Sequence, residues 1–381
     1  MLLELDSDQE VFREATARFL ADRTPTEVIR RFRNDPAGFD PDFWREGAEL
    51  GWTSLLVAEE HGGGSISGAG LVDLTIAAYE FGSRAAPGPL VPTNIVASAL
   101  SAAGGEAHRP VLDGLLAGTT IATWCLGEPA PGDQLGANVQ LTCRQDGSDL
   151  ILDGVKRPVE AAGQAHYLLV TARAETGLTQ LLVPADTPGI SLQPMQTVDL
   201  TRRFWTVRFD QVRVPADAVV GEIGGAAEQV ERQLQQALVI LAAEAVGAMQ
   251  TAFDLTVAWA FERYSFGRPL ASYQALKHRF ADMKTWLEAS HAISDTAAAA
   301  VDAAAPDGKE LASAAKSFVG EYGTELVQDC IQLHGGIGVT FEHDLHLYLR
   351  RVTVNRALYG TPAEHRQRVA DVVEHLKEAA A

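Results

Sequence analysis

The spacing of apolar residues changes twice along the chain. In its first third, apolar side chains recur every three or four positions, as at Phe12, Ala15 and Phe19, which is the spacing of one face of an α-helix. The same spacing predicts further helices at 41–50 and 71–82, and two short helices between 93 and 117.

Short runs rich in β-branched and aromatic residues follow from Thr119 onward. Turns such as Asp146-Gly147 and Asp153-Gly154 separate these runs. Strands this short and this evenly spaced predict a β-barrel or sandwich. The predicted strands occupy 120–126, 137–144, 149–156, 166–172, 178–184, 190–194 and 205–215.

Helical spacing returns at Gly225 and continues to the end of the chain. Four long segments at 226–264, 272–303, 308–333 and 362–379, joined by short connections, predict an antiparallel bundle. The fold class is therefore expected to be α+β. We expect an N-terminal α-helical domain at 1–118, a middle β-barrel domain at 119–222 and a C-terminal four-helix bundle at 223–381.

Composition and charge narrow the function classes. The net charge of −19 opposes binding to nucleic acid or to anionic lipid, so neither is an expected partner. The longest apolar run, 237–249, is interrupted by Glu244 and is too short to cross a bilayer. The three cysteines form no pair with metal-ligand spacing, so we expect a reduced cytoplasmic protein with no metal site.

A first candidate site lies between two of the predicted long helices. Gly267 and Pro269 interrupt the helical pattern there. A new helix start exposes backbone donors, and Arg263 and Arg268 add forked cations beside it. This combination suits a diphosphate, although an ordinary helix hairpin with surface arginines would have the same sequence.

A second candidate site follows the third long helix. Gly335, Gly336 and Gly338 stand within four residues of each other, after Gln332. Closely spaced glycines allow close backbone approach, and their amides can bind an anion or an adenine edge. One helix cap and turn requires fewer glycines than this.

Together these two motifs, on an α–β–α chain of this length, resemble the acyl-CoA dehydrogenase family. The resemblance covers essentially the whole chain. Its marks are Arg263-x-x-Phe266-Gly267 with Gln274, Gln332-x-His334-Gly335-Gly336-x-Gly338, Glu128-Pro129, Arg202-Arg203, and Tyr359-Gly360-Thr361.

The resemblance implies an FAD cofactor bound across a subunit interface. In the family, the elements matching Arg263, Phe266, Gly267, Gln274, Gln332 and the three glycines hold the ADP half of the neighbour's FAD, and Thr361 belongs to the same cofactor-binding set. The β domain holds the flavin ring of its own subunit. The implied reaction removes an α proton from an acyl-CoA while a hydride passes to the flavin. An electron-transfer flavoprotein and a homo- or hetero-oligomer, dimer or tetramer, are the implied partners.

The chain departs from the family at the catalytic base. The usual glutamate stands directly before the Gly-Thr pair near the C-terminus, and Tyr359 stands there instead. A neutral tyrosine is a poor base at neutral pH, because its reference pKa is about 10. Some relatives place the glutamate at the start of the helix before Arg263, where this chain has Ala237. The base is therefore unknown. Glu160 and Glu244 are weak candidates, and a structural ion pair is the favoured role for Glu244.

The expected flavin-ring contacts are changed as well. Pro158 replaces the family's aromatic residue, Glu160 replaces its hydroxyl residue, and Gly127 replaces the hydroxyl residue before the Glu-Pro pair. Asp133 stands where the family has a serine. A negative charge from Glu160 beside a ring that accepts hydride is unfavourable unless it is neutralised.

The departures are unevenly distributed, which favours one hypothesis over two others. Elements that act on a neighbour's FAD are intact, whereas those for the chain's own flavin ring and base are changed. This resembles the FAD-completing subunit of hetero-oligomeric actinobacterial acyl-CoA dehydrogenases that act on steroid side chains. The alternatives are a self-sufficient homo-oligomeric dehydrogenase with a displaced carboxylate, and a flavin monooxygenase on the same fold.

Overall fold

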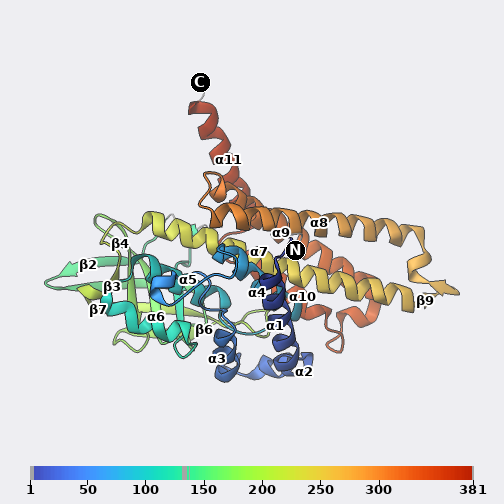
Figure 1. The fold of residues 1–381 in the computed structure, drawn as a ribbon, viewed down its shortest axis with the longest axis horizontal. Coiled ribbons are helices and arrows are strands. Elements are labelled where there is room, and N and C mark those ends of the chain that lie inside the picture. The colour runs from blue at the N-terminus through green and yellow to red at the C-terminus, as the bar shows by residue number, and fades with distance from the viewer. Residues whose placement is uncertain (1–3, 131–134, 137, 380–381) are drawn as a thin grey trace. The chain divides into compact units, whose positions relative to one another are not determined.

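The structure is a computed structural model that describes residues 4–130, 135–136 and 138–379 (Figure 1). Its contacts divide the chain into two compact units. We call residues 1–29, 75–86 and 238–381 the helical unit, and residues 30–74 and 87–237 the sheet unit. These units interleave along the sequence, and our domain boundaries at 118 and 222 stay a prediction.

The sheet unit is built on one mixed β-sheet. Its strands pair in the order β6-β7-β3-β2-β4-β5-β8, and β1 pairs in parallel with β4. The strands are β1 (Ala122–Cys125), β2 (Thr142–Asp146), β3 (Asp149–Glu160), β4 (Tyr167–Ala174), β5 (Gly177–Pro184), β6 (Ile190–Pro194), β7 (Phe204–Pro215) and β8 (Val219–Val220).

All seven predicted strands are present, but the expected closed barrel is not. Among the described residues, the path of paired strands runs from β6 to β8 and does not join its ends. The sheet is held by a core that includes Leu152, Val170 and Phe209, each at most 1% exposed. Full burial of such a side chain contributes about 1.5–3 kcal/mol. One buried face is therefore enough for stability without closure.

Three helices accompany the sheet in the same unit: α3 (Pro41–Glu49), α5 (Leu90–Ala103) and α6 (Arg109–Leu116). Asp40 caps α3 by accepting from the backbone N–H of Asp42 at 3.0 Å, and Pro41 occupies the first helical turn. Helix α5 is apolar on most of its surface and packs against β1.

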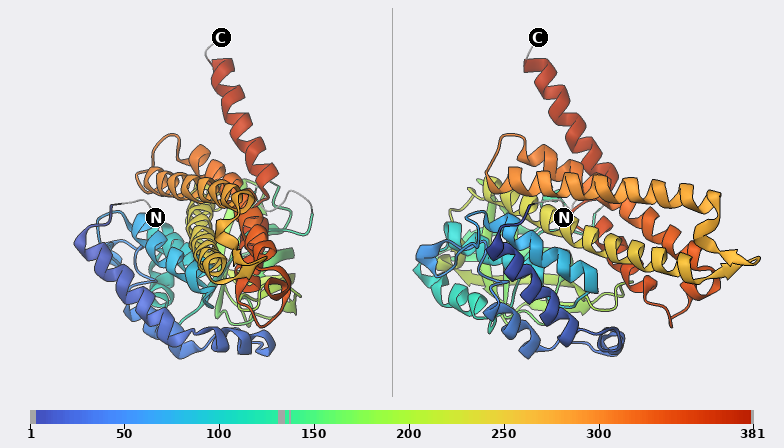
Figure 2. Two further views of the ribbon diagram at one scale, coloured as in Figure 1. Left: turned by 90° about the vertical axis from the view of Figure 1, so that its right-hand side faces the viewer. Right: turned by 45° about the vertical axis from the view of Figure 1, so that its right-hand side comes forward.

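The helical unit contains the predicted bundle. Its long helices run beside one another in Figures 1 and 2. Helices α4 and α7 begin in the sheet unit and end in the helical unit. The helices are α1 (Ser7–Arg23), α4 (Gly70–Arg84), α7 (Ala227–Glu262), α8 (Gln274–Asp302), α9 (Gly308–His334), α10 (Leu345–Ala357) and α11 (Pro362–Ala379).

The prediction of a four-helix C-terminal bundle is wrong by one helix. The described part of 223–381 has five long helices, because α10 was not predicted. Helix α10 directs Arg351 and Asn355 inward, and both are buried. These polar residues interrupt the apolar spacing that identifies a core-facing helix.

Helices α4 and α7 cross at backbone contact inside the helical unit. A Cβ on Gly82 would overlap the carbonyl oxygen of Glu244, and one on Gly247 would overlap that of Tyr79. Helix α7 is long and apolar enough by composition to cross a membrane. However, 78% of its most apolar window is buried inside the molecule, as in the core helix of a globular protein.

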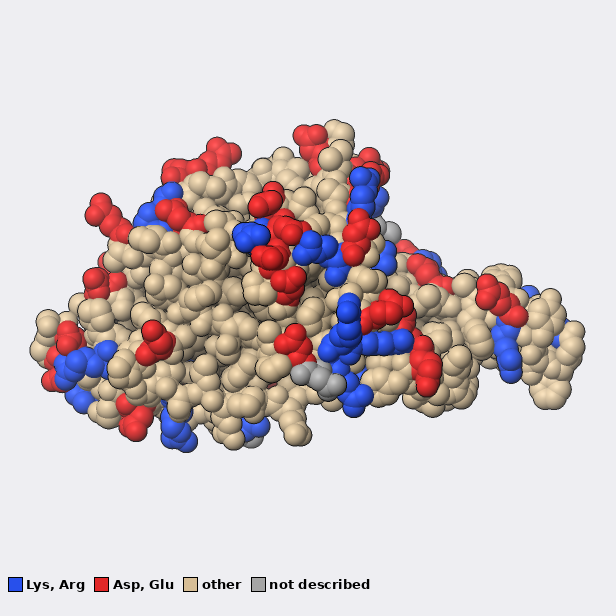
Figure 3. Space-filling view, turned by 90° about the horizontal axis from the view of Figure 1, so that it is seen from below, with Lys and Arg blue, Asp and Glu red and all other residues tan. Residues whose placement is uncertain are grey.

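Charged side chains are mixed on the face drawn in Figure 3. The blue Lys and Arg side chains there lie among red Asp and Glu side chains and do not form one continuous basic surface. On this face, the acidic net charge of the chain is therefore not offset by a basic patch of the size that nucleic-acid binding requires.

Candidate cofactor-binding site

The predicted helix break between α7 and α8 is a β-hairpin at one end of the bundle (Figures 1 and 2). Strand β9 (Tyr264–Ser265) pairs with β10 (Arg268–Pro269), and both tip residues have positive φ, +49° at Phe266 and +81° at Gly267. Two successive residues in this region are typical of a type I′ hairpin turn. The Phe266 side chain is 97% exposed, so it packs against little else in the chain.

An aromatic stack connects the hairpin to the glycine-rich segment. The guanidinium of Arg263 lies 5.9 Å from the ring of Trp259, which stacks on His334 with ring centroids 5.1 Å apart. His334 donates from Nδ1 to the Cys330 carbonyl, and burial lowers its pKa. The neutral ring therefore packs well on the indole. Among the described residues, the buried indole Nε1 of Trp259 has no hydrogen-bond partner.

The three glycines after His334 have two different roles. A Cβ on Gly338 would lie 2.5 Å from the Ile331 carbonyl oxygen, so the packing of the chain itself excludes a side chain there. A Cβ on Gly335 or Gly336 would meet no described atom within 4 Å. Gly335 needs its φ of +66°. Contacts within the described chain give no reason for glycine at position 336.

The two glutamines of the candidate site lie at the start of α8 and the end of α9. An ion pair connects these two helix ends. Gln274 is the first residue of α8, is exposed, and bonds His278 at 3.1 Å. Gln332 is exposed in the last turn of α9. Arg279 of α8 pairs with Asp329 of α9, which holds these two helix ends together. The hairpin, the stack and the open glycines can therefore bind an anion next to an aromatic surface.

Tyr359 and Ala237 stand at the two positions where the sequence resemblance predicts the catalytic base, and that assignment stays a prediction. Tyr359 is 9% exposed, has a φ of +53°, and its carbonyl accepts from His365 Nε2 at 2.8 Å. Ala237 is fully buried in α7. Thr361 caps α11 and donates its hydroxyl to Glu364 at 2.7 Å, so its hydroxyl proton already has an acceptor within the chain.

Glu244 is held in a buried hydrogen-bonded network. Arg351 Nη1 donates to Glu244 Oε1 at 2.6 Å, and Asn355 Nδ2 donates to Oε2 at 2.7 Å. Arg351 also donates from Nη2 to the carbonyls of Ala85 and Ala86, at 3.1 and 2.9 Å. Both carboxylate oxygens accept hydrogen bonds from buried side chains, which is the arrangement expected of a structural ion pair.

Glu160 is neutralised in the same way in the sheet unit. Arg202 Nε donates to Glu160 Oε1 at 2.7 Å, and Arg202 Nη2 donates to Oε2. The two side chains are 4% and 6% exposed. Such a bidentate pair fixes the carboxylate and removes its charge from the surroundings. The neutralisation that the sequence required for Glu160 is therefore present.

Glu128 of the Glu-Pro motif, which follows β1, also forms a buried ion pair. Glu128 Oε1 accepts from Lys156 Nζ at 2.7 Å, and its two oxygens also accept from the backbone N–H groups of Gln140 and Leu141. Lys156 is fully buried and also donates to the Leu126 carbonyl. This network fixes the chain near Gly127. The expected change at Asp133 lies outside the described residues.

Family models match the chain in three consecutive stretches. They are the N-terminal domain of acyl-CoA dehydrogenase at 6–119, the middle domain at 123–212 and the C-terminal domain at 226–374. The chain belongs to the acyl-CoA dehydrogenase family. The resemblance seen in the sequence motifs is thus confirmed, and members of this family are FAD-dependent oxidoreductases.

Individual acyl-CoA dehydrogenases are similar over nearly the whole chain. Acyl-CoA dehydrogenase IpdE2 of Mycolicibacterium smegmatis is 29% identical over 367 residues, which are 96% of this chain and 98% of the relative. A solved steroid ACAD named Tcur3481-Tcur3483 is 29% identical with a TM-score of 0.88, covering 98% of this chain and 99% of that one. A glutaryl-CoA dehydrogenase from Mycobacterium smegmatis in complex with FADH2, at 24% identity and a TM-score of 0.86, shares the fold; 97% of this chain and 95% of that chain are covered.

Three features of this acyl-CoA dehydrogenase were not predicted from its sequence. Trp259 joins Arg263 to the glycine segment, and its only signal was a tryptophan one helical turn before the arginine. The partners of Glu244, Arg351 and Asn355, stand at i and i+4 on one helix, which was a usable signal. Arg202 was noted as a family mark but not as the partner of Glu160.

Proposed function

We propose that this chain is the FAD-completing subunit of an acyl-CoA dehydrogenase whose catalytic base and flavin-ring site belong to a second, unlike chain. The proposal rests on one observation: no candidate carboxylate for the catalytic base is free of a buried arginine partner. The two familiar positions hold Tyr359 and Ala237, and both substitute candidates, Glu160 and Glu244, are buried in pairs with arginine.

The residues that would hold the ADP half of FAD fit that group. Arg263 supplies a cation beside an aromatic surface, and the Nε1 of Trp259 is a buried donor without a described acceptor. Gly335 and Gly336 leave open space where any side chain would project. A diphosphate with an adenine ring needs these three things: positive charge, exposed backbone and a flat apolar surface.

The exposed tip of the hairpin supports a site shared with another subunit. Phe266 is 97% exposed, and Phe261 and Tyr264 close to it in sequence are 66% and 62% exposed. A group of exposed apolar side chains of this kind is typical of interfaces. Val339, 75% exposed in the glycine-rich segment, belongs to the same end of the bundle.

The chemistry then divides between the two chains. FAD, when bound, accepts a hydride from the acyl-CoA, and an electron-transfer flavoprotein is the expected acceptor of the electrons. The residues of this chain bind and orient the nucleotide part of the cofactor. Proton removal from the substrate is assigned to the unlike chain, because no carboxylate here is available at a family position. Acyl-CoA thioesters with steroid-derived side chains are the substrates to test first, because a similar solved structure is a steroid ACAD.

The experiment compares the chain alone with the chain co-expressed with the neighbouring reading frame. We expect the chain alone to purify with little flavin and to show no acyl-CoA dehydrogenation, and the co-purified pair to carry FAD and activity. A yellow, active chain without any partner would refute the proposal and favour the homo-oligomeric alternative. In that case, loss of activity on substituting Glu160 or Glu244 would identify the displaced base.

A further inference from the structure

The hairpin between α7 and α8, labelled β9 in Figure 1, carries a second arginine that lies on an aromatic ring. The Cζ atom of Arg268 is 3.9 Å from the centre of the Tyr273 ring, whereas that of Arg263 is 5.9 Å from the ring of Trp259. A cation within about 6 Å of a ring centre is attracted to the ring face. Arg268 is exposed, so without this contact its long side chain would sample many rotamers in water.

Tyr273 also contacts the other strand of the hairpin. Its hydroxyl donates to the Ser265 carbonyl at 2.6 Å, and Ser265 belongs to β9, whereas Arg268 belongs to β10. Two residue pairs join these strands, and the tip residue Phe266 has a φ of +49°. A two-stranded hairpin alone is marginal in water, and a positive φ is uncommon for residues other than glycine. The contacts of one side chain with both strands therefore hold the hairpin in one shape.

Backbone hydrogen bonds fix the position of Tyr273 itself. A short 3-10 helix, η6 (Leu270–Ser272), connects the hairpin to α8. The Leu270 N–H donates to the Arg263 carbonyl at 2.8 Å, and the Tyr273 N–H donates to the Leu270 carbonyl at 3.1 Å. Tyr273 is half-buried directly before α8 begins. Its ring is therefore a fixed surface for the guanidinium.

The charge of Arg268 stays available to a ligand. Three other arginines of the helical unit each pair with a carboxylate: Arg279, Arg351 and Arg366. Within the part of the chain that the structure describes, Arg268 has no such pair. A guanidinium that stacks on a ring keeps its N–H groups, which lie in its own plane, available as donors. This is the arrangement that bidentate binding of a phosphate group requires.

We propose that Tyr273 is a positioning residue, which holds Arg268 and the hairpin ready for a diphosphate before the diphosphate binds. The inference rests on the proposed function, in which this end of the bundle receives the ADP half of FAD. Ordering a side chain in advance removes the cost of ordering it from the binding step. For one arginine this corresponds to about twofold to tenfold in affinity. The ring orders the arginine, and the hydroxyl orders the hairpin.

The test compares the binding of ADP with that of adenosine, each measured by competition with FAD. It uses the flavin-free chain, both alone and co-expressed with the neighbouring reading frame. Adenosine lacks the diphosphate and does not need Arg268. Tyr273→Leu should therefore weaken ADP binding by about twofold to tenfold and leave adenosine binding unchanged. Tyr273→Phe keeps the ring beside Arg268 and should retain most of the ADP affinity.

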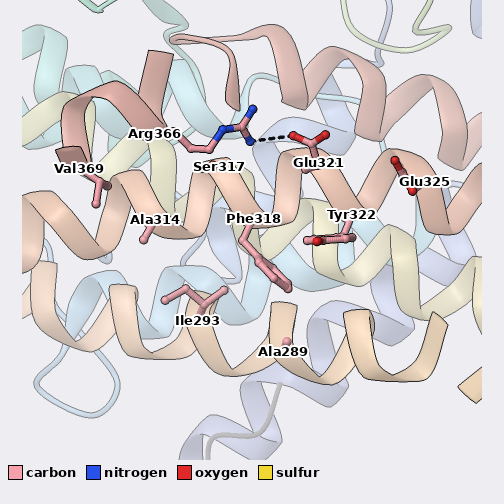
Figure 4. Close-up of a pocket in the computed structure, with 10 residues that line it drawn as sticks. All are labelled: Ala289, Ile293, Ala314, Ser317, Phe318, Glu321, Tyr322, Glu325, Arg366 and Val369. Atoms are coloured by element: carbon pink, nitrogen blue, oxygen red, sulfur yellow. Dashed lines mark hydrogen bonds and ion pairs between the residues drawn. The ribbon is translucent and has the colours of Figure 1, made fainter. Parts of the chain in front are cut away.

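A double-mutant cycle separates positioning from a general effect on stability. Arg268→Gln removes the cation that Tyr273 holds, so Tyr273→Leu should cause little further loss of ADP affinity in that background. Losses that simply add would overturn the proposal. Tyr322→Leu is the matched control, because Tyr322, labelled in Figure 4, is another half-buried tyrosine of the helical unit and stacks on Trp286 at 5.3 Å. It should lower the melting temperature and leave ADP affinity unchanged.

The outcomes distinguish this inference from the proposed function. A Tyr273→Leu chain that binds ADP as tightly as the unchanged chain would overturn the positioning role and leave the proposed function standing. Equal losses of ADP and adenosine affinity would do the same. An unchanged chain that binds neither FAD nor ADP, alone or with the co-expressed partner, would overturn the proposed function as well.

Discussion

The buried pair between Glu244 and Arg351 gives a sharp prediction, because Glu244 is either a locked structural anion or a displaced base. The perturbation is Arg351→Met, which removes the cation and keeps an apolar side chain of similar length. Arg351 is 1% exposed and Glu244 is 5% exposed, so the remaining carboxylate cannot be solvated in place. Asn355 Nδ2 would still donate to the carboxylate, but it carries no positive charge.

The size of the effect follows from this burial. Breaking a buried ion pair by removing one partner costs about 3–5 kcal/mol, because an uncompensated charge is left behind. The variant also deprives the carbonyls of Ala85 and Ala86 of their donor, which places the expected loss toward the upper end of that range. The corresponding loss at an exposed pair is about 0–1 kcal/mol.

The assay is urea unfolding followed by circular dichroism, with the free energy of unfolding compared between variants. Lys284→Met is the matched control, because Lys284 pairs with Glu288 in the same unit and both side chains are more than 40% exposed. The double variant Glu244→Leu/Arg351→Met should recover part of the loss, since it removes the buried charge together with its partner. A loss below about 1 kcal/mol for Arg351→Met would refute the reasoning and leave Glu244 available as a base.

Three further predictions concern the glycine segment and the C-terminal turn. Gly336→Leu should leave the melting temperature of the chain unchanged but lower the flavin content of the complex, whereas Gly338→Ala should lower the melting temperature, because its Cβ would lie 2.5 Å from a carbonyl oxygen. Burial lowers the pKa of His365 to about 4, so the unfolded chain binds an extra proton between about pH 6.5 and 4 and stability falls through that window. His365→Gln should flatten this fall in acid unfolding curves, and an unchanged slope would contradict the assignment. Tyr359→Glu should give the isolated chain no dehydrogenase activity, since the flavin-ring contacts are changed too; a clear gain of turnover would show that only the base is missing.

Local signals determined most of what could be predicted about the fold. The seven strands β1 to β7 and each long helix except α10 were visible as apolar spacing, and turn residues marked their ends, whereas the two-residue strands β8, β9 and β10 were not predicted. The sequence did not reveal that the sheet stays open, because closure depends on which distant strands pair. For example, β3 lies between β7 and β2 in the sheet, although β7 is far from both in sequence. Short-range patterns carry no information on such pairings.

Those parts of the candidate site that form a contiguous sequence motif could be predicted. Those that depend on contacts between residues distant in sequence could not. A single helix C-cap needs fewer glycines than this segment contains. The open space beside Gly335 and Gly336 agrees with that observation from the sequence. The sequence favoured an ion pair for Glu244 but did not identify its partner, because Arg351 is 107 residues away. The hairpin was predicted only as a helix break, since the positive φ of Phe266 is unusual for an aromatic residue.

The central claim is that this acyl-CoA dehydrogenase chain completes an FAD site without being able to hold the cofactor or run the reaction alone. The most direct measurement is the flavin-to-protein ratio of the chain purified alone and again with the neighbouring reading frame co-expressed. The account predicts a ratio near zero for the chain alone and one FAD for each pair of unlike chains. A stoichiometric flavin content in the chain alone, with acyl-CoA-dependent reduction of that flavin, would contradict it.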